Sequence, residues 1–166
     1  FHYSFPLFGK TISTNDTQVE FRNLSLTEAD EPALRAALAV MTDCNAFVLD
    51  NCGLSNEKMA EIRADYPRTE LVWRISFGKY SAMTNQETIR AVYNVFDDTC
   101  ENLKYCWRTK YMDIGHNEYL KDSSFISGMK SLEYVIISGS MISDLKPFAA
   151  CKNLKVLEAA FCEYIY

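Results

Sequence analysis

The chain has 166 residues, with 17 lysines and arginines against 22 aspartates and glutamates, so its formal net charge is −5. Hydrophobic residues make up 48% of it and charged residues 23%, proportions typical of a globular protein that exclude wholesale disorder. The acidic balance argues against a nucleic-acid partner, which requires a basic field, and no apolar run approaches the ~20 residues of a membrane span. Length alone fits one domain.

Residues 1–16 are predicted to form a β-hairpin. An alternating aromatic run leads into Phe-Gly-Lys at 8–10, and Thr-Ile-Ser follows at 11–13. The segment 71–84 repeats this arrangement around a second Phe-Gly-Lys at 77–79. A hairpin at the start of the chain would cover the open edge of a sheet, which every array of repeats needs.

Two copies of a long repeat occupy residues 17–77. The second copy follows the first by 28 residues, and the matching positions are Val19 and Phe47, Phe21 and Leu49, and Leu24 and Cys52. Each copy is expected to be a strand, and a third strand is expected at 71–75.

A helix is expected after each long copy. Thr27 and Asp30 resemble a capping box at the start of the first helix, and Ser55 is the expected N-cap of the second, which ends before Pro67. The apolar faces expected to be buried are Leu34, Leu38 and Met41 in the first helix, and Met59 and Ile62 in the second.

The segment 78–98 breaks the period. Thr84 and Glu87 have the spacing of a capping box, and Ile89, Val92 and Phe96 would then share one side of a helix. We interpret 78–98 as an insertion between the long repeats and the shorter ones that follow.

Residues 99–166 contain short repeats. The segment that begins at Leu132 returns 22 residues later at Leu154, and an earlier copy precedes it by 23 residues. The strand and turn positions of the three copies are Met112, Ile114 and Asn117; Val135, Ile137 and Ser140; and Leu157, Ala159 and Cys162. The last copy is truncated by the end of the sequence.

This pattern resembles the leucine-rich repeat superfamily. The 22-residue copies, with Asp-Leu-Lys-Pro-Phe at 144–148, look like the short repeats of internalin-type bacterial surface proteins, and the 28-residue copies look like the ribonuclease-inhibitor type. The resemblance implies an α/β fold: a right-handed leucine-rich-repeat solenoid with a parallel concave sheet and an N-terminal β-hairpin cap. It would be a single domain over 1–166, since a short strand cannot bury its apolar face alone and neighbouring copies must stack.

The family also carries a ladder of asparagines that bond buried backbone groups at the turn after each strand. The positions that match the ladder in this chain are Cys52, Asn117, Ser140 and Cys162. Because the thiols bond weakly, we expect a degenerate ladder in a divergent member of the superfamily.

Catalytic and metal-binding patterns are scarce. Six cysteines form no Cys-x-x-Cys pair, and with only two histidines a zinc site is not expected. A hydrolase built on Cys106 and His116, with Asp113 as orienting acid, is an alternative, but Cys106 aligns with inward positions of the later repeats. We expect the cysteines to be small buried thiols, and we predict no enzyme activity, no cofactor and no metal.

What remains is the exposed face of the sheet, where most family members bind partners. By register, the predicted partner-binding residues are Tyr111, Asp113, His116, Tyr134, Ile136, Glu158 and Phe161. Aromatic side chains grouped with acidic neighbours suit protein recognition. The alternative is that these are scattered surface aromatics.

The sequence therefore predicts a non-catalytic binding module that recognises a protein, with no nucleic-acid partner. By resemblance alone it would belong to an extracellular or cell-surface protein of a bacterium. The other interpretation is a structural spacer in a longer chain, which a start at Phe1 and an interrupted last repeat favour. Self-association is expected through an uncapped C-terminal edge formed by Ala159, Tyr164 and Ile165.

Overall fold

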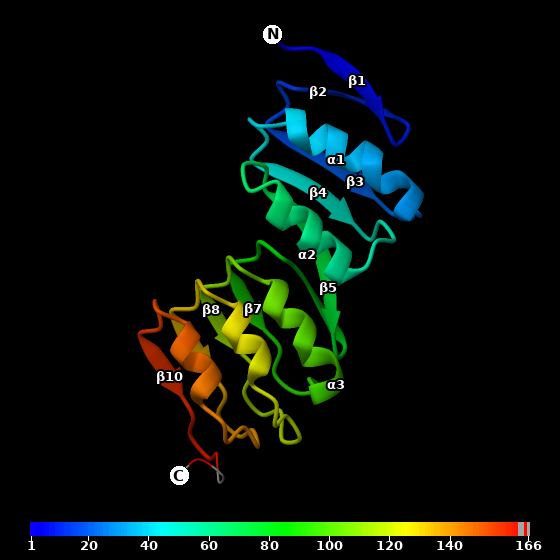
Figure 1. The fold of residues 1–166 in the computed structure, drawn as a ribbon. Coiled ribbons are helices and arrows are strands. Elements are labelled where there is room, and N and C mark those ends of the chain that lie inside the picture. Colours follow the sequence, from blue (N-terminus) through cyan, green and yellow to red (C-terminus); the bar gives the residue numbers. More distant parts are fainter. Residues whose placement is uncertain (163–164, 166) are drawn as a thin grey trace. The chain divides into compact units, whose positions relative to one another are not determined.

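The structure is a computed structural model, and it describes residues 1–162 and 165. Its contacts divide the chain into two compact units, Phe1–Arg74 and Ile75–Tyr166 (Figure 1). Both units contain parallel strands linked by helices, which confirms a mixed α/β fold with parallel pairing. A continuous right-handed solenoid and a single domain over 1–166 stay predictions. In the described part of the chain, no helix has the length and apolar character needed to cross a membrane.

The first unit opens with the predicted hairpin. Strand β1 (Ser4–Leu7) pairs antiparallel with β2 (Lys10–Ser13). The two residues of the turn between them, Phe8 and Gly9, both have positive φ, the backbone that tight hairpins favour. The Phe8 ring lies 5.5 Å from the ring of Phe21 in an edge-on arrangement. The hairpin therefore contacts the first repeat strand through an aromatic pair.

Three parallel strands follow at the predicted period: β3 (Gln18–Arg22), β4 (Ala46–Asp50) and β5 (Leu71–Phe77). Val19 pairs with Phe47, which pairs in turn with Leu71, so the 28-residue period is confirmed as a strand register. These three side chains are at most 3% exposed, whereas their neighbours on β3 are exposed. Alternate residues thus face the core, as a half-buried strand requires.

Both predicted helices are present. A single 3-10 turn, η1 (Glu28–Asp30), leads into α1 (Glu31–Val40), and α2 spans Asn56–Asp65. The carboxylate of Asp30 accepts a hydrogen bond from the Thr27 backbone N–H at 2.8 Å, and Ser55 Oγ accepts one from the Lys58 N–H at 3.2 Å. The faces expected to be buried are buried: Leu34, Leu38, Met41, Met59 and Ile62 are all 2% exposed or less.

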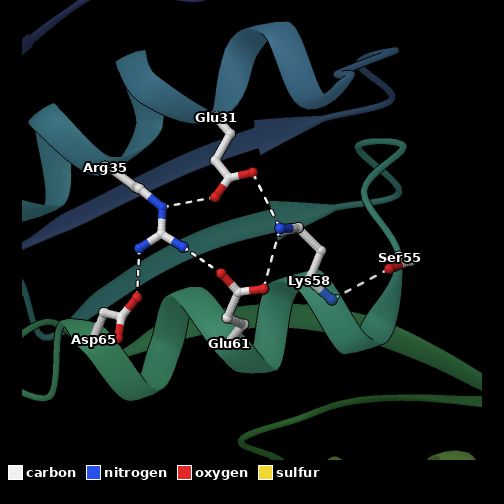
Figure 2. A network of polar contacts seen from close by, with 6 residues as sticks. All are labelled: Glu31, Arg35, Ser55, Lys58, Glu61 and Asp65. Carbon is white, nitrogen blue, oxygen red and sulfur yellow. Dashed lines mark hydrogen bonds and ion pairs between the residues drawn. The ribbon is translucent and has the colours of Figure 1, made fainter.

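An ionic network joins α1 to α2 (Figure 2). The Arg35 guanidinium contacts Glu31 on its own helix at 2.7 Å, and Glu61 and Asp65 on α2 at 2.8 and 2.5 Å. Lys58 closes the network by contacting Glu31 at 3.3 Å and Glu61 at 3.1 Å. The hydrogen bond from Arg35 lowers the pKa of Glu31 below its ordinary value. Sequence analysis did not predict this network, which ties consecutive repeats together through their helices.

The second unit begins with a hairpin like the first. The end of β5 is joined to β6 (Tyr80–Met83) by a two-residue turn whose first member, Gly78, has φ of +58°. A Cβ at Gly78 would lie 2.0 Å from the carbonyl oxygen of Asn94, so only glycine fits there. The similarity between 71–84 and the N-terminal hairpin is therefore structural as well as sequential.

The helix predicted within 84–96 is wrong. Residues Thr88–Arg90 form strand β7, which pairs in parallel with β8 (Tyr111–Asp113), and Ile89 lies opposite Met112. Part of the segment interpreted as an insertion is thus a strand of the second sheet. Ile89 and Ala91, both buried, fit the alternation of a strand, and pairing with the next repeat decides between the two periods.

The rest of the second sheet follows the predicted short period. Strands β9 (Tyr134–Ile136) and β10 (Val156–Glu158) complete a parallel sheet in the order β10-β9-β8-β7. Tyr111 pairs with Tyr134, and Tyr134 with Val156, which confirms the spacings of 23 and 22 residues.

Short helices connect these strands. They are α3 (Asp97–Cys100) with η2 (Glu101–Tyr105), η3 (Ser124–Gly128) and η4 (Lys146–Ala150). Each places one apolar residue and one residue just after it in the core: Leu103 and Cys106, Ile126 and Met129, Phe148 and Cys151. The equivalence of these positions was predicted from the sequence.

Candidate functional site

The turns after the strands contain a buried polar ladder. Asn117, which is 2% exposed, donates from Nδ2 to the carbonyl oxygens of Ala91 at 2.9 Å and Ile114 at 2.7 Å. Its Oδ1 accepts a hydrogen bond from the backbone N–H of Val95 at 2.9 Å. One side chain thus satisfies backbone groups of two consecutive repeats, which would otherwise be buried without partners.

Thiols and a hydroxyl occupy the other ladder positions. The Cys52 Sγ lies 3.4 Å from the Phe21 carbonyl oxygen, and the Cys162 Sγ lies 3.3 Å from that of Ile137. Ser140 Oγ lies 3.7 Å from the Cys162 Sγ. These are the backbone contacts expected at ladder positions, made here with a weaker donor than an amide.

The same turns force one residue per repeat into the left-handed region. In the second unit these residues form what we call the turn row: Tyr93 (φ 67°), His116 (φ 56°), Gly139 (φ 69°) and Phe161 (φ 57°). Backbone bonds link them, since the His116 N–H donates to the Ser138 carbonyl at 2.7 Å and the Gly139 N–H to that of Ala160 at 2.9 Å. Glycine fits this backbone without strain, whereas a bulky aromatic residue costs free energy there.

Aromatic rings of the turn row stack on one another. The ring centroids of Tyr93 and His116 lie 5.6 Å apart, and their planes are 29° from parallel. Gly139 follows on the other side of His116, where an added Cβ would lie 3.4 Å from the imidazole Nδ1. Phe161 ends the row with 89% of its side-chain surface exposed. Strained aromatic residues at an exposed turn are more typical of a binding surface than of a core.

A small concavity lies beside the turn row. Its volume is about 200 Å³, and it is lined by two consecutive turns of the second unit. We call it the aromatic pocket, and the side chains that define it are Tyr93, Phe96, His116, Glu118 and Tyr119. It combines four rings with one carboxylate.

A pair of tyrosines lies on the exposed face of the second sheet. The rings of Tyr111 on β8 and Tyr134 on β9 stack with centroids 5.3 Å apart and planes 22° from parallel. Both residues are half-buried, and Val156 continues their row on β10 with 40% of its surface exposed. This row provides apolar area beside polar strand residues.

The structure places the predicted partner-binding residues differently from one another. His116, Glu158 and Phe161 are exposed, and Ile136 is half-buried. Asp113 is only 7% exposed, so the prediction that it faces a partner is wrong. Its carboxylate accepts a hydrogen bond from the Gly115 N–H at 3.1 Å and contacts Arg90 at 3.4 Å, which makes it a support for the turn.

The alternative of a Cys–His enzyme finds no support in the arrangement of its residues. Cys106 is fully buried, as predicted from its alignment with the inward positions, whereas His116 is exposed. The six cysteines are free thiols; five are buried, and Cys162 is intermediate. Burial raises the pKa of the Cys100 thiol to about 12, so it stays protonated and unreactive at neutral pH.

Sequence reasoning missed two residues of the aromatic pocket, Tyr93 and Tyr119. Tyr93 precedes His116 by 23 residues, the same spacing that links the short repeats, so the period could have found it. The helix predicted over 84–96 hid that match. Tyr119 lies in a connection that follows no repeat pattern, and only the structure brings it to the pocket.

Comparison with known proteins finds likeness in solved structures only. No protein-family description matches the sequence, and no curated protein matches it. The chain is similar in structure to an internalin (inlF) from Listeria monocytogenes, with a TM-score of 0.36 and 11% identity over 90% of this chain and 44% of that one. It is also similar to an internalin C2 (inlC2) from the same species, with a TM-score of 0.28 and 15% identity over 74% of this chain and 54% of that one. The chain thus spans about half the length of these proteins.

Proposed function

We propose that the chain is a non-catalytic leucine-rich-repeat binding module that recognises a protein through the exposed face of its second sheet and the adjacent turn row. The observation that supports this most is the turn row itself. Three of its four residues are aromatic in a backbone that favours glycine, and their rings are exposed or stacked on the surface. Such an arrangement costs stability, and a binding role gives a reason for it.

The tyrosine pair extends the proposed surface. Tyrosine supplies a large contact area at a low cost in conformational entropy, and aromatic residues dominate interface hot spots. Tyr111 and Tyr134 are already held by stacking, so little freedom remains to be lost on binding. The exposed Glu158 would lie at the polar rim of the surface.

The short repeats, which resemble those of internalin-type surface proteins in sequence, support an extracellular or cell-surface location for the module. Self-association through the C-terminal edge is also part of the proposal. Val156 on β10 is exposed there, while Tyr164, one of the residues expected to form that edge, lies outside the described residues.

Site-specific photo-crosslinking tests the proposed surface. A photoreactive phenylalanine analogue placed at Tyr134 should trap a protein from bacterial or host extracts, and the same group at the exposed Ser127 on η3 should not trap it. Alanine at Tyr111 and Tyr134 together should weaken capture by a second, unmodified attachment without unfolding the protein. Trapping from Ser127 but not from Tyr134 would contradict the assignment of the surface.

A further inference from the structure

The size of the aromatic pocket limits what it can bind. Its volume of about 200 Å³ lies below the ~300–1,000 Å³ of pockets that enclose drug-sized ligands. It corresponds to the space of roughly seven water molecules at ~30 Å³ each, which suits one long side chain. The occupant is therefore part of a larger molecule that rests on the surrounding surface.

The rings of the pocket present their faces and edges to solvent. Tyr93 is 54%, Phe96 44% and Tyr119 71% exposed, and His116 is exposed beside them. Tyr93 is held outward by two consecutive residues in the left-handed region, itself and Asn94, and its ring is fixed against His116. Exposed aromatic faces that are fixed in advance attract cations through the ring quadrupole.

The charge of the pocket has one sign. Glu118 is its only charged lining residue, and its carboxylate has no hydrogen bond or ion pair with any of residues 1–162 and 165. Carboxylates elsewhere on this unit are paired, such as Glu87 with Lys110 at 2.9 Å. An unpaired carboxylate among aromatic rings complements a cationic group that also has an apolar stem.

We propose that the aromatic pocket receives one arginine side chain of a protein partner, with its guanidinium stacked on the rings and paired with the Glu118 carboxylate. That the partner is a protein rests on the proposed function. Arginine fits better than lysine because its planar, weakly hydrated guanidinium stacks on aromatic faces and can donate two parallel hydrogen bonds to one carboxylate. A lysine ammonium would have to give up a tighter hydration shell for the same contacts.

The test is a titration of the intact chain, followed by amide NMR shifts, with blocked tripeptides in which glycines flank arginine, lysine or the neutral arginine analogue citrulline. The arginine peptide should give saturable shifts at residues 93–96 and 116–119 with a dissociation constant on the order of 5 mM. The lysine peptide should bind several-fold more weakly, and the citrulline peptide should not saturate at ten times that concentration.

Matched variants locate the effect. Glu118→Gln, which keeps the shape and removes the charge, should weaken the arginine peptide about fivefold, and Tyr93→Ala should abolish its saturable shifts. Glu28→Gln, at an exposed carboxylate of the first unit, should change nothing. Equal shifts with arginine and citrulline, or binding that Glu118→Gln leaves intact, would overturn the proposal. Protein capture through Tyr134 would still stand in that case, so the two hypotheses fail separately.

Discussion

The ring of Tyr93 stacks on the imidazole of His116 at a centroid distance of 5.6 Å, although both residues hold their backbones in the left-handed region. The stacking partly offsets the backbone strain, since an aromatic pair contributes about 0.5–1.5 kcal/mol beyond its buried area. Phe161, which occupies the same position two repeats later, has no such pair among the described residues. The cost of an aromatic residue in the turn row should therefore be measurable at Phe161.

Replacing Phe161 by glycine should stabilise the second unit. The substitution relieves a backbone that costs a non-glycine residue about 1–2 kcal/mol, while glycine loses about 0.5–1 kcal/mol in chain entropy, so a net gain of about 0.5 kcal/mol is expected. Because the side chain is 89% exposed, little burial is lost. Urea unfolding measures the change, and Phe161→Ala is the control, since it keeps the strain. If the glycine variant is no more stable than the alanine variant, the turn row is not strained.

Asn117→Ala should destabilise the second unit by about 1–3 kcal/mol, because it leaves buried backbone groups without partners. Asn117 bonds Ala91, Ile114 and Val95 from a buried position. The matched control is Asn153→Ala, which removes one exposed bond of 3.5 Å to Lys130 and should cost less than about 0.5 kcal/mol. Chemical denaturation of both variants compares them directly. Equal losses would mean that the ladder carries no special share of stability.

The ionic network of the first unit predicts an acid-sensitive contribution to stability. The pKa of Glu31 is lowered from its ordinary value of 4.5 in the folded chain, chiefly by the hydrogen bond from Arg35. The stabilisation is therefore fully present above the unfolded pKa and is lost as pH falls through the lower, folded pKa. Arg35→Met should lower the melting temperature at pH 6, and this difference from the wild type should shrink at pH 3.

An exposed pair provides the control for that pH series. Arg22 contacts Glu20 at 2.6 Å, but their side chains are 65% and 45% exposed, so Arg22→Met should change the melting temperature little at either pH. A difference for Arg35→Met that is the same at pH 6 and pH 3 would show that Arg35 acts through packing and not through its carboxylate partners.

Thiol labelling should separate the cysteines by burial. In the native chain at pH 7.5, Cys162 should react first with iodoacetamide, and the five buried thiols should react only after unfolding. The raised pKa of Cys100, about 12, leaves almost no thiolate at this pH. Peptide mass spectrometry after timed quenching gives the order. Rapid native labelling of Cys106 would revive the alternative of a Cys–His enzyme.

The sequence predicts the strands of this fold better than their surroundings. The spacings of 28, 23 and 22 residues translate directly into strand register, because stacked repeats place equivalent residues opposite one another. The error at Thr88–Arg90 has a physical cause: its apolar residues fit both periods, and only pairing with β8 selects the strand. Without the strand, Tyr93 could not be placed beside His116.

The site was predicted less completely than the fold. The face that carries Tyr111 and Tyr134 follows from strand alternation, but the burial of Asp113 depends on a turn N–H and an arginine from the neighbouring strand. The Arg35 network depends on how two helices face each other, which sequence spacing does not encode. Contacts between elements decided every residue that was misplaced.

Hydrogen exchange on the chain bound to the partner captured through Tyr134 tests the central claim most directly. The account predicts new protection at residues 93–96, 111–119 and 134–139, which carry the tyrosine pair and most of the turn row, and unchanged exchange in η2, η3 and η4. Protection confined to those three short helices, with the turn row exchanging as in the free chain, would contradict it.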